Sequence, residues 1–351
     1  MNVWYLAFAT DSLTYTIAKA LSYGGHDVFV WVADAQYMSR RPDGIQQRLR
    51  DIPRVKFVVQ DESQLPSLIE RLIVQTFPRP TEVLRCLRPL ARRARTIAVI
   101  SAGDRSRSWG AAMRLQWLEL KGLARYATKI DRMLYKDGCY RRDVLGLLAP
   151  RLATGFDVHS QFLHDAALFG IIHSRDWDPD LRRPILVNFL GCQDPEARKR
   201  ILDSMRHMFR STNQGPIPAI TTKAVFWHEY SDAAPVGLGS IEFVQKLSSS
   251  DFTLCPRGYS VVTHRPIEAL LRGSIPVVSS NELDLYGVDL EDAANCVAVS
   301  DEDWPGAIQR LARMKETEII AMRRNIYAMF NEHLNYEALS KRIRTRLGVA
   351  E

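Results

Sequence analysis

Short apolar runs alternate with segments of helical spacing along most of the chain. The run Asn2–Ala9 predicts a buried strand, and Thr10-Asp11-Ser12 behind it are residue types that begin helices. Gly24-Gly25 then ends that helix before a second apolar run at 26–32. A strand, a helix and a second strand in this order favour a βαβ unit and a parallel sheet.

The same patterns extend through the first half of the chain. They predict strands at 55–59 and 96–101, helices at 64–76, 81–94 and 109–127, and a helix or buried connector at 160–170. The opening βαβ unit lacks G-x-G-x-x-G, so the usual dinucleotide-binding sequence is missing.

A polar segment divides the chain. Residues 172–183 are charged, contain a proline and lack apolar periodicity, which indicates a domain boundary. We therefore expect an N-terminal Rossmann-like domain over 1–178, a second over 179–320 and a helical tail over 321–351. The second domain is predicted to have strands at 184–190, 224–227, 252–255, 275–278 and 296–299, and helices at 195–208, 240–247, 267–271 and from 303.

The stretch 250–278 contains strand, loop, helix and strand in one run. Phe252–Cys255 is apolar, Pro256-Arg257-Gly258 breaks it, and Gly273 ends the following helix. Such a unit leaves its ligand-binding loop at the carboxyl end of the first strand, where Arg257 and Gly258 lie. A small, basic, flexible loop suits a phosphate group.

The run CPRGYSVVTHRPIEALLRGSIPVV resembles the C-terminal signature of the exostosin-like glycosyltransferases. In that family a CPRG-type loop precedes a helix with the pattern E-A-x-x-x-G-x-I-P-V, and 182–191 resembles the strand and glycine loop that open the same domain. The resemblance covers about 182–303. It implies the α/β GT-B fold, with two Rossmann-like domains facing a cleft, the nucleotide-sugar donor on the C-terminal domain and the acceptor on the N-terminal one.

The resemblance and the chemistry of a diphosphate together indicate a donor site. Arg257 is expected to touch the diphosphate, with Gly258 allowing close backbone approach; the alternative is that Arg257 pairs with a surface carboxylate. Glu268 matches a glutamate whose two oxygens bind the ribose hydroxyls of the donor in many GT-B enzymes. The remaining expected donor-site residues are Gly191, Tyr259, His264 and Arg265.

Residues other than those of the expected donor site bear on the stereochemistry of sugar transfer and on the identity of the general base. Retaining members of the broader fold often carry Glu-x7-Glu, but Ser260 stands eight residues before Glu268, which favours inversion. Inversion needs a general base on the acceptor hydroxyl. Asp11, after the first strand, is one candidate, although aspartate is also an ordinary helix N-cap. Asp104 and His159 are the alternatives.

Metal and disulfide sites are not expected. The five cysteines are scattered and never form C-x-x-C, which argues against a zinc site and a disulfide framework. Asp176-Trp177-Asp178 has the Asp-x-Asp form that a different glycosyltransferase fold uses for manganese, but here it lies in the polar linker. We therefore predict that the departing diphosphate is stabilised without a metal or a cofactor.

The charge balance suggests a polyanionic partner. The formal net charge is +7, and five arginines between Arg85 and Arg95 alternate with leucines. This segment could rest on an anionic membrane and bring in a lipid-linked acceptor, or it could be a solvated helix face. No recognised nucleic-acid-binding module accompanies the charge. We see no signal peptide or spanning segment, and we expect a cytoplasmic protein, peripheral at the membrane's inner face.

The sequence thus favours an inverting glycosyltransferase that uses a nucleotide sugar, with UDP as the expected nucleotide, in surface polysaccharide or glycoconjugate synthesis. The alternatives are a retaining GT-B enzyme and a non-catalytic module that keeps the nucleotide pocket.

Overall fold

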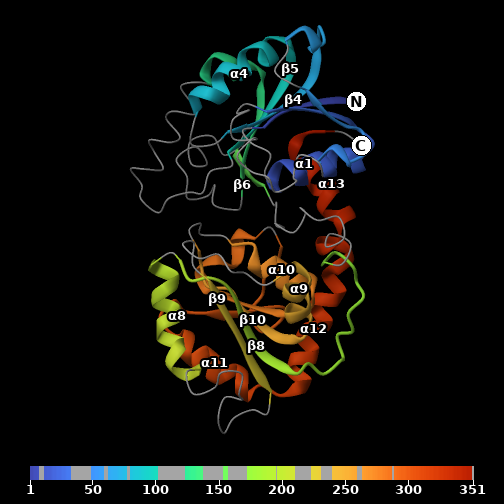
Figure 1. Cartoon of the computed structure of the whole chain (residues 1–351). Coiled ribbons are helices and arrows are strands. Elements are labelled where there is room, and N and C mark those ends of the chain that lie inside the picture. Colours follow the sequence, from blue (N-terminus) through green and yellow to red (C-terminus); the bar gives the residue numbers. More distant parts are fainter. Residues whose placement is uncertain are drawn as a thin grey trace. The chain divides into compact units, whose positions relative to one another are not determined.

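The computed structural model groups the chain into two compact units (Figure 1). The first comprises Met1–Ala166 and Glu337–Glu351, and the second comprises Ala167–Tyr336. The structure describes residues 1–7, 12–32, 49–58, 62–76, 80–101, 123–136, 153–156, 172–194, 196–209, 223–230, 239–258, 263–286 and 288–349.

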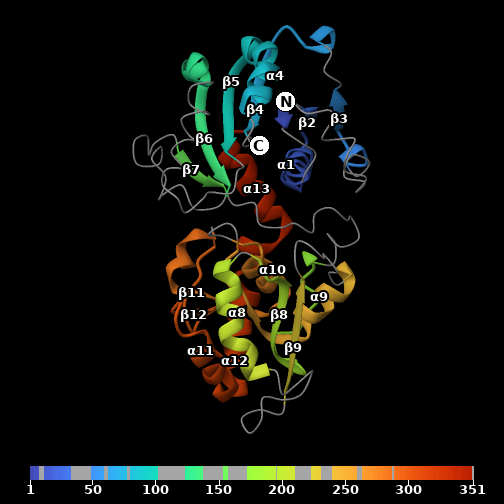
Figure 2. The same ribbon diagram turned by 60° about the vertical axis from the view of Figure 1, so that its left-hand side comes forward.

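The first unit contains a seven-stranded parallel sheet in the order β3-β2-β1-β4-β5-β6-β7 (Figure 2). Its strands are β1 Asn2–Ala7, β2 Asp27–Val32, β3 Val55–Val58, β4 Ile69–Thr76, β5 Ala94–Ser101, β6 Ile130–Lys136 and β7 Ala153–Phe156. The strand order changes direction between β1 and β4. In open α/β sheets, ligands bind beyond the carboxyl ends of the strands at such a switch point.

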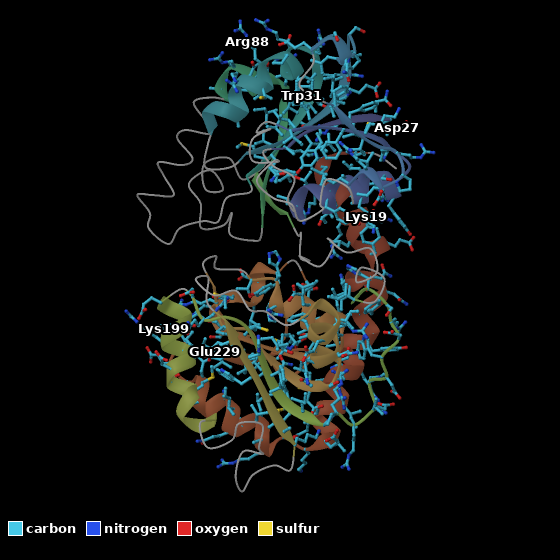
Figure 3. All side chains as sticks on the ribbon, in the orientation of Figure 1. Lys19, Asp27, Trp31, Arg88, Lys199 and Glu229 are labelled. Carbon is cyan, nitrogen blue, oxygen red and sulfur yellow. The ribbon has the colours of Figure 1, made fainter. Side chains whose placement is uncertain are left out.

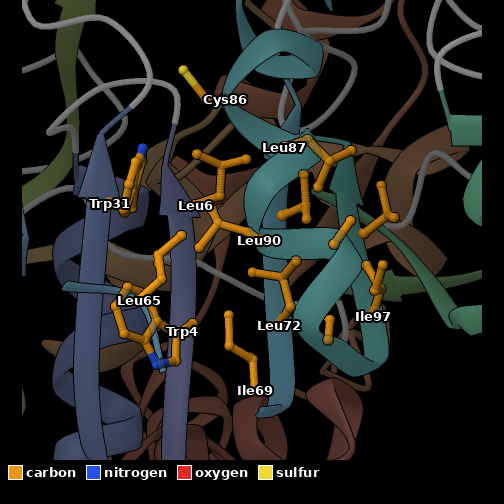
Figure 4. Packing of buried hydrophobic residues seen from close by; sticks show 14 of the residues in the cluster. Trp4, Leu6, Trp31, Leu65, Ile69, Leu72, Cys86, Leu87, Leu90 and Ile97 are labelled. Carbon is orange, nitrogen blue, oxygen red and sulfur yellow. The ribbon is translucent and has the colours of Figure 1, made fainter. Parts of the chain in front are cut away.

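Helices cover both faces of this sheet, and side chains fill the layers between them (Figure 3). Trp4 and Leu6 of β1 point to the face covered by α4 (Pro80–Arg93), where they join a buried cluster with Leu87 and Leu90 (Figure 4). Tyr5, on the opposite face, bonds to Gln75 on the side of α1 (Ser12–Tyr23). Burial on both faces explains why these strands form continuous apolar runs.

The C-terminal helix α13 (Tyr336–Leu347) packs against α1 in the first unit. The Ser340 hydroxyl donates to the Ala20 carbonyl at 2.9 Å, and Arg344 donates to Ser340 at 2.6 Å. The end of the helix is held by Arg71 of β4, which donates to the Leu347 carbonyl. The chain therefore returns to its first unit after completing the second.

The prediction of a helix over 64–76 is wrong, because this segment contains β4. Its apolar residues have helical spacing only because Arg71 and Gln75 interrupt the strand pattern. Both polar side chains are buried with distant partners: Arg71 pairs with Asp131 at 2.7 Å, and Gln75 accepts from Tyr5 and Thr14. These partners offset the cost of burying a polar group.

The hydrophobic pattern also failed to predict β6 and β7. Of the helix predicted at 109–127, only the end is described, and it forms a 3₁₀ turn over Ala124–Lys129.

The second unit has a five-stranded parallel sheet in the order β12-β11-β10-β8-β9. Its strands, all close to the predicted positions, are β8 Ile185–Cys192, β9 Ala224–Tyr230, β10 Ser250–Leu254, β11 Ile275–Ser279 and β12 Val297–Val299. The helices are α8 Glu196–Phe209, α9 Ser240–Ser248, α10 Arg265–Leu271, α11 Trp304–Arg313 and α12 Glu316–Met329. The switch point of this sheet lies between β8 and β10.

Buried charges occupy the amino-terminal edge of the second sheet. Lys223, just before β9, lies 2.6 Å from Asp251 of β10 and 2.7 Å from Glu316 of α12, and Arg323 lies 3.7 Å from Asp251. Burial raises the pKa of Asp251, whereas its bond to Lys223 lowers it. This network attaches α12 to the amino-terminal edge of the sheet.

The Asp176-Trp177-Asp178 segment has a structural role. The Trp177 indole donates to the Leu271 carbonyl at 3.1 Å, and its ring lies against Gly273. Asp176 pairs with Arg272 at 2.9 Å, while Asp178 accepts a bond from the Asp180 amide. Asp176 and Trp177 therefore fasten the end of α10, and Asp178 stabilises the local turn.

A helix that crosses a bilayer needs about 20 apolar residues. The helices described for this chain include none of that kind.

Candidate donor-binding site

Two loops meet at the switch point of the second sheet. Gly191 and Cys192 end β8, and Cys255–Gly258 follow β10. The Cys255 amide still bonds to the Val277 carbonyl of β11 at 2.9 Å, so the chain leaves the ladder only at Pro256. Parallel strands end at one edge, which brings both loops to the same place.

Helix α10 begins directly behind the second loop. Pro266 occupies its first turn, where a missing amide hydrogen costs nothing, and the Glu268 amide bonds to the His264 carbonyl at 3.1 Å. Residues 266–271 are buried, and Gly273, with φ of +65°, ends the segment. The predicted strand, loop, helix and glycine stop are confirmed here.

Arg265 and Glu268 form a buried pair on the first turn of α10. The Arg265 Nη1 lies 3.1 Å from the Glu268 Oε2. Burial raises the pKa of Glu268 to about 7, although Arg265 lowers it. The Arg265 guanidinium also lies 4.3 Å from the centre of the Phe243 ring and approaches Gly191. The Arg265 guanidinium therefore lies near the end of β8, paired with the Glu268 carboxyl group, whose pKa is about 7.

Arg257 has a carboxylate partner in this structure. Its Nη1 lies 3.1 Å from the Asp301 Oδ2, and Asp301 in turn accepts a bond from the Ser279 hydroxyl at 2.8 Å. This ion pair corresponds to the alternative role considered for Arg257 from the sequence, which was pairing with a carboxylate. It leaves the Arg257 Nε without a hydrogen-bond partner among the described residues, and the side chain is partly exposed.

Arg198 of α8 is a site residue that sequence reasoning missed. Its Nε donates to the Arg257 carbonyl at 3.0 Å, and its Nη1 donates to the Cys192 carbonyl at 2.9 Å. One guanidinium thereby ties the loop after β8 to the loop after β10. The segment Glu-Ala-Arg-Lys-Arg reads as a solvated helix face, and the only sequence signal was an arginine shortly after the Gly191 loop.

The structure explains why a glycine stands at position 258. A Cβ at this position would lie 2.5 Å from the Arg198 Nη2, so alanine would displace the guanidinium that joins the loops. The sequence predicts that Gly258 allows a ligand to approach the backbone closely. In this structure the neighbour that needs the space is Arg198.

We expect Arg198→Ala to weaken binding of a nucleoside diphosphate about tenfold, because both loops lose a charge-assisted tether of ~1.5 kcal/mol or more. Titration calorimetry with UDP measures this. Arg200→Ala is the matched control, because Arg200 is exposed and its one ion-pair partner among the described residues is Glu196 of the same helix. Equal affinities of the two variants for UDP would show that the tether does not shape the site.

Four predicted site residues, Asp11, Asp104, His159 and Tyr259, lie outside the described residues. The first three share one feature of the fold. Strands β1, β5 and β7 precede them and are parallel members of one sheet, so the strands end at the same edge. The choice of a general base among the three stays a prediction.

Metal-ligating side chains do not gather in the described part of the chain, where no group of three or more histidine, cysteine or acidic residues is close enough to hold an ion. Cys255, at the start of the donor loop, is fully buried, which raises the pKa of its thiol. A thiol in this state is a poor nucleophile or ligand.

Comparison with known proteins identifies related folds. The model of the exostosin GT47 domain matches residues 85–314, about two thirds of the chain. No curated protein sequence matches. Among solved structures, an alpha-glucosyltransferase in complex with UDP-glucose and DNA containing an abasic site has a TM-score of 0.61 at 11% identity, covering 99% of both chains.

Two other solved structures are similar over their full length. HepE from Anabaena in complex with UDP has a TM-score of 0.58 at 11% identity and 100% coverage of both chains. A mutant of TarM from S. aureus, in complex with Fondaparinux, alpha-GlcNAc-glycerol and UDP, has a TM-score of 0.60 at 8% identity and 99% coverage of both. These similarities confirm the predicted fold class, an α/β chain of the GT-B type.

Proposed function

The chain belongs to the exostosin GT47 family of glycosyltransferases, and from that premise we propose that it transfers a sugar from a UDP-sugar to a glycan or glycoconjugate. The observation that carries the proposal is the cluster of charged residues at the switch point of the second sheet, between β8 and β10. Arg257 lies there on the loop after β10, Arg198 of α8 joins that loop to the loop after β8, and Arg265 of α10 pairs with the buried carboxyl of Glu268. UDP is favoured because HepE and TarM are solved with it.

The cluster suits the two polar parts of such a donor. As the glycosidic bond breaks, negative charge grows on the diphosphate, and fixed guanidinium groups and backbone amides stabilise it. The partly exposed guanidinium of Arg257 is the group proposed to contact the diphosphate. Glu268 has two acceptor oxygens, which fit the two hydroxyls of a ribose. Because these groups supply the positive charge, the proposed transfer needs no metal, and full activity in EDTA is the expected result.

We propose that transfer inverts the anomeric centre. The support is Ser260 at the position where retaining enzymes of this fold often carry a glutamate. One of Asp11, Asp104 and His159 then accepts the proton of the acceptor hydroxyl. NMR of the product anomer tests the claim directly. Retention of configuration would contradict it, and nucleotide binding without transfer or hydrolysis would indicate a non-catalytic module.

Donor affinity should depend on pH through Glu268. Only the ionised carboxylate accepts from both ribose hydroxyls, and its pKa in the unliganded protein is raised to about 7. The ionised fraction therefore rises about tenfold between pH 6 and pH 8, and the affinity for UDP-glucose should rise by a similar factor. UDP-glucose is the suitable probe because its diphosphate diester does not titrate in this range. Glu268→Gln should show a flat profile; an unchanged slope would assign the pH dependence to another group.

A further inference from the structure

The outward face of α4 in the first unit is strongly cationic. Arg85, Arg88 and Arg92 are three and four residues apart, which puts them on one side of the helix, and all three are exposed. Arg88 points away from the sheet (Figure 3). On the other side of the helix, Leu87 and Leu90 are fully buried in the core. These three arginines are called the α4 surface below.

Few counter-charges accompany the α4 surface in the sequence. Among the described residues, none of its three guanidinium groups has an ion-pair or hydrogen-bond partner. Glu82, three positions before Arg85, is the one acidic residue in the sequence of α4, and none follows it up to position 103. Elsewhere, exposed arginines often have a carboxylate, as in the pairs Arg200 with Glu196, Arg310 with Asp303 and Arg324 with Asp180. Three guanidinium groups on one helix face, without a partner among the described residues, can bind an external anion.

Neighbouring residues extend this surface. The Lys129 amine donates to the Ala91 carbonyl at 2.8 Å and to the Arg92 carbonyl at 3.1 Å, which fixes the turn Ala124–Lys129, with its exposed Arg125, beside the end of α4. Leu68 is 59% exposed and precedes Ile69, whose strand partner Ala94 follows the helix directly. An exposed leucine near the end of a cationic helix suits a lipid interface better than a nucleic-acid backbone.

We propose that the α4 surface adsorbs to a bilayer that contains anionic phospholipid headgroups. The contact is electrostatic, because Leu87 and Leu90 of α4 are already buried in the core. The sequence left open whether this segment rests on an anionic membrane or is a solvated helix face, and the proposal takes the first of these alternatives. The proposal is independent of the donor-site assignment, since it concerns different residues in a different unit.

The test is sedimentation of the full chain with vesicles of phosphatidylcholine, either pure or with about 30% phosphatidylglycerol. The variant R85Q/R88Q/R92Q is compared with R182Q/K199Q/R313Q. The control removes the same charge from three exposed side chains of the second unit that have no partner among the described residues. Each basic residue near such a surface contributes roughly a factor of five, so the first variant should partition about 100-fold more weakly. Circular dichroism verifies that both variants are folded.

High salt should release the wild-type protein from the mixed vesicles. The proposal is overturned if the wild type does not bind them, if it binds pure phosphatidylcholine equally well, or if both variants lose binding to the same extent. Binding of an RNA oligonucleotide is measured in parallel. If the α4 substitutions abolish RNA binding but leave vesicle binding intact, the surface recognises nucleic acid and the membrane proposal is wrong.

Discussion

Glu268→Ala should weaken UDP binding about 100-fold. The carboxylate is expected to accept from both ribose hydroxyls, and each hydrogen bond to a charged group contributes ~1.5 kcal/mol or more. Titration calorimetry with UDP provides the measurement. Glu242→Ala is the control, because Glu242 is an exposed glutamate on the first turn of α9 in the same unit. Glu268→Gln keeps the shape and separates the loss of charge from a loss of packing.

A nucleotide that lacks one ribose hydroxyl tests the role of Glu268 more specifically. The wild type should bind 2′-deoxy-UDP at least tenfold more weakly than UDP, because one acceptor oxygen of Glu268 loses its partner. The Glu268→Ala variant should bind the two nucleotides equally. If the variant still distinguishes them, or if its affinity for UDP stays within threefold of the wild type, Glu268 does not hold the ribose.

Gly273→Ala should destabilise the second unit by about 4 kcal/mol. The residue has φ of +65°, where a side chain costs roughly 1–2 kcal/mol. An added Cβ would also lie 2.4 Å from the Trp177 ring, which must move out of a packed position at a further ~1–3 kcal/mol. Thermal unfolding should show a loss of roughly 10 °C in Tm.

A double-mutant cycle with Trp177→Leu separates the two causes. In that background the ring overlap is gone, so Gly273→Ala should cost only about 1–2 kcal/mol, the contribution of the positive φ. An equal cost in both backgrounds would contradict the overlap with Trp177. The consequence for function is direct, because Gly273 and Trp177 fix the end of the helix that carries Arg265 and Glu268.

Local patterns were sufficient to predict most of the second unit. Each of its strands is a short apolar run, Gly273 ends α10 as a left-handed residue, and the CPRG-type loop marked the position of the switch point. These features depend on neighbours in sequence. The family resemblance and the GT-B fold class followed from the same stretch and are confirmed.

Long-range partners explain what the sequence could not predict. Strand β4 was mistaken for a helix because Arg71 and Gln75 are buried by bonds to residues 60 or more positions away. Arg198 acts through two backbone carbonyls, which no residue pattern encodes. The ion pair between Arg257 and Asp301 and the docking of Ser340 on Ala20 likewise depend on the assembled fold.

The central claim is that the switch point between β8 and β10 binds the diphosphate and ribose of a nucleotide sugar. A crystal structure of the chain with UDP tests it most directly. We expect the diphosphate within hydrogen-bond distance of Arg257 and the loop after β10, and the ribose hydroxyls on Glu268. UDP bound elsewhere, with the pairs Arg257–Asp301 and Arg265–Glu268 undisturbed and without contact to the nucleotide, would contradict the account.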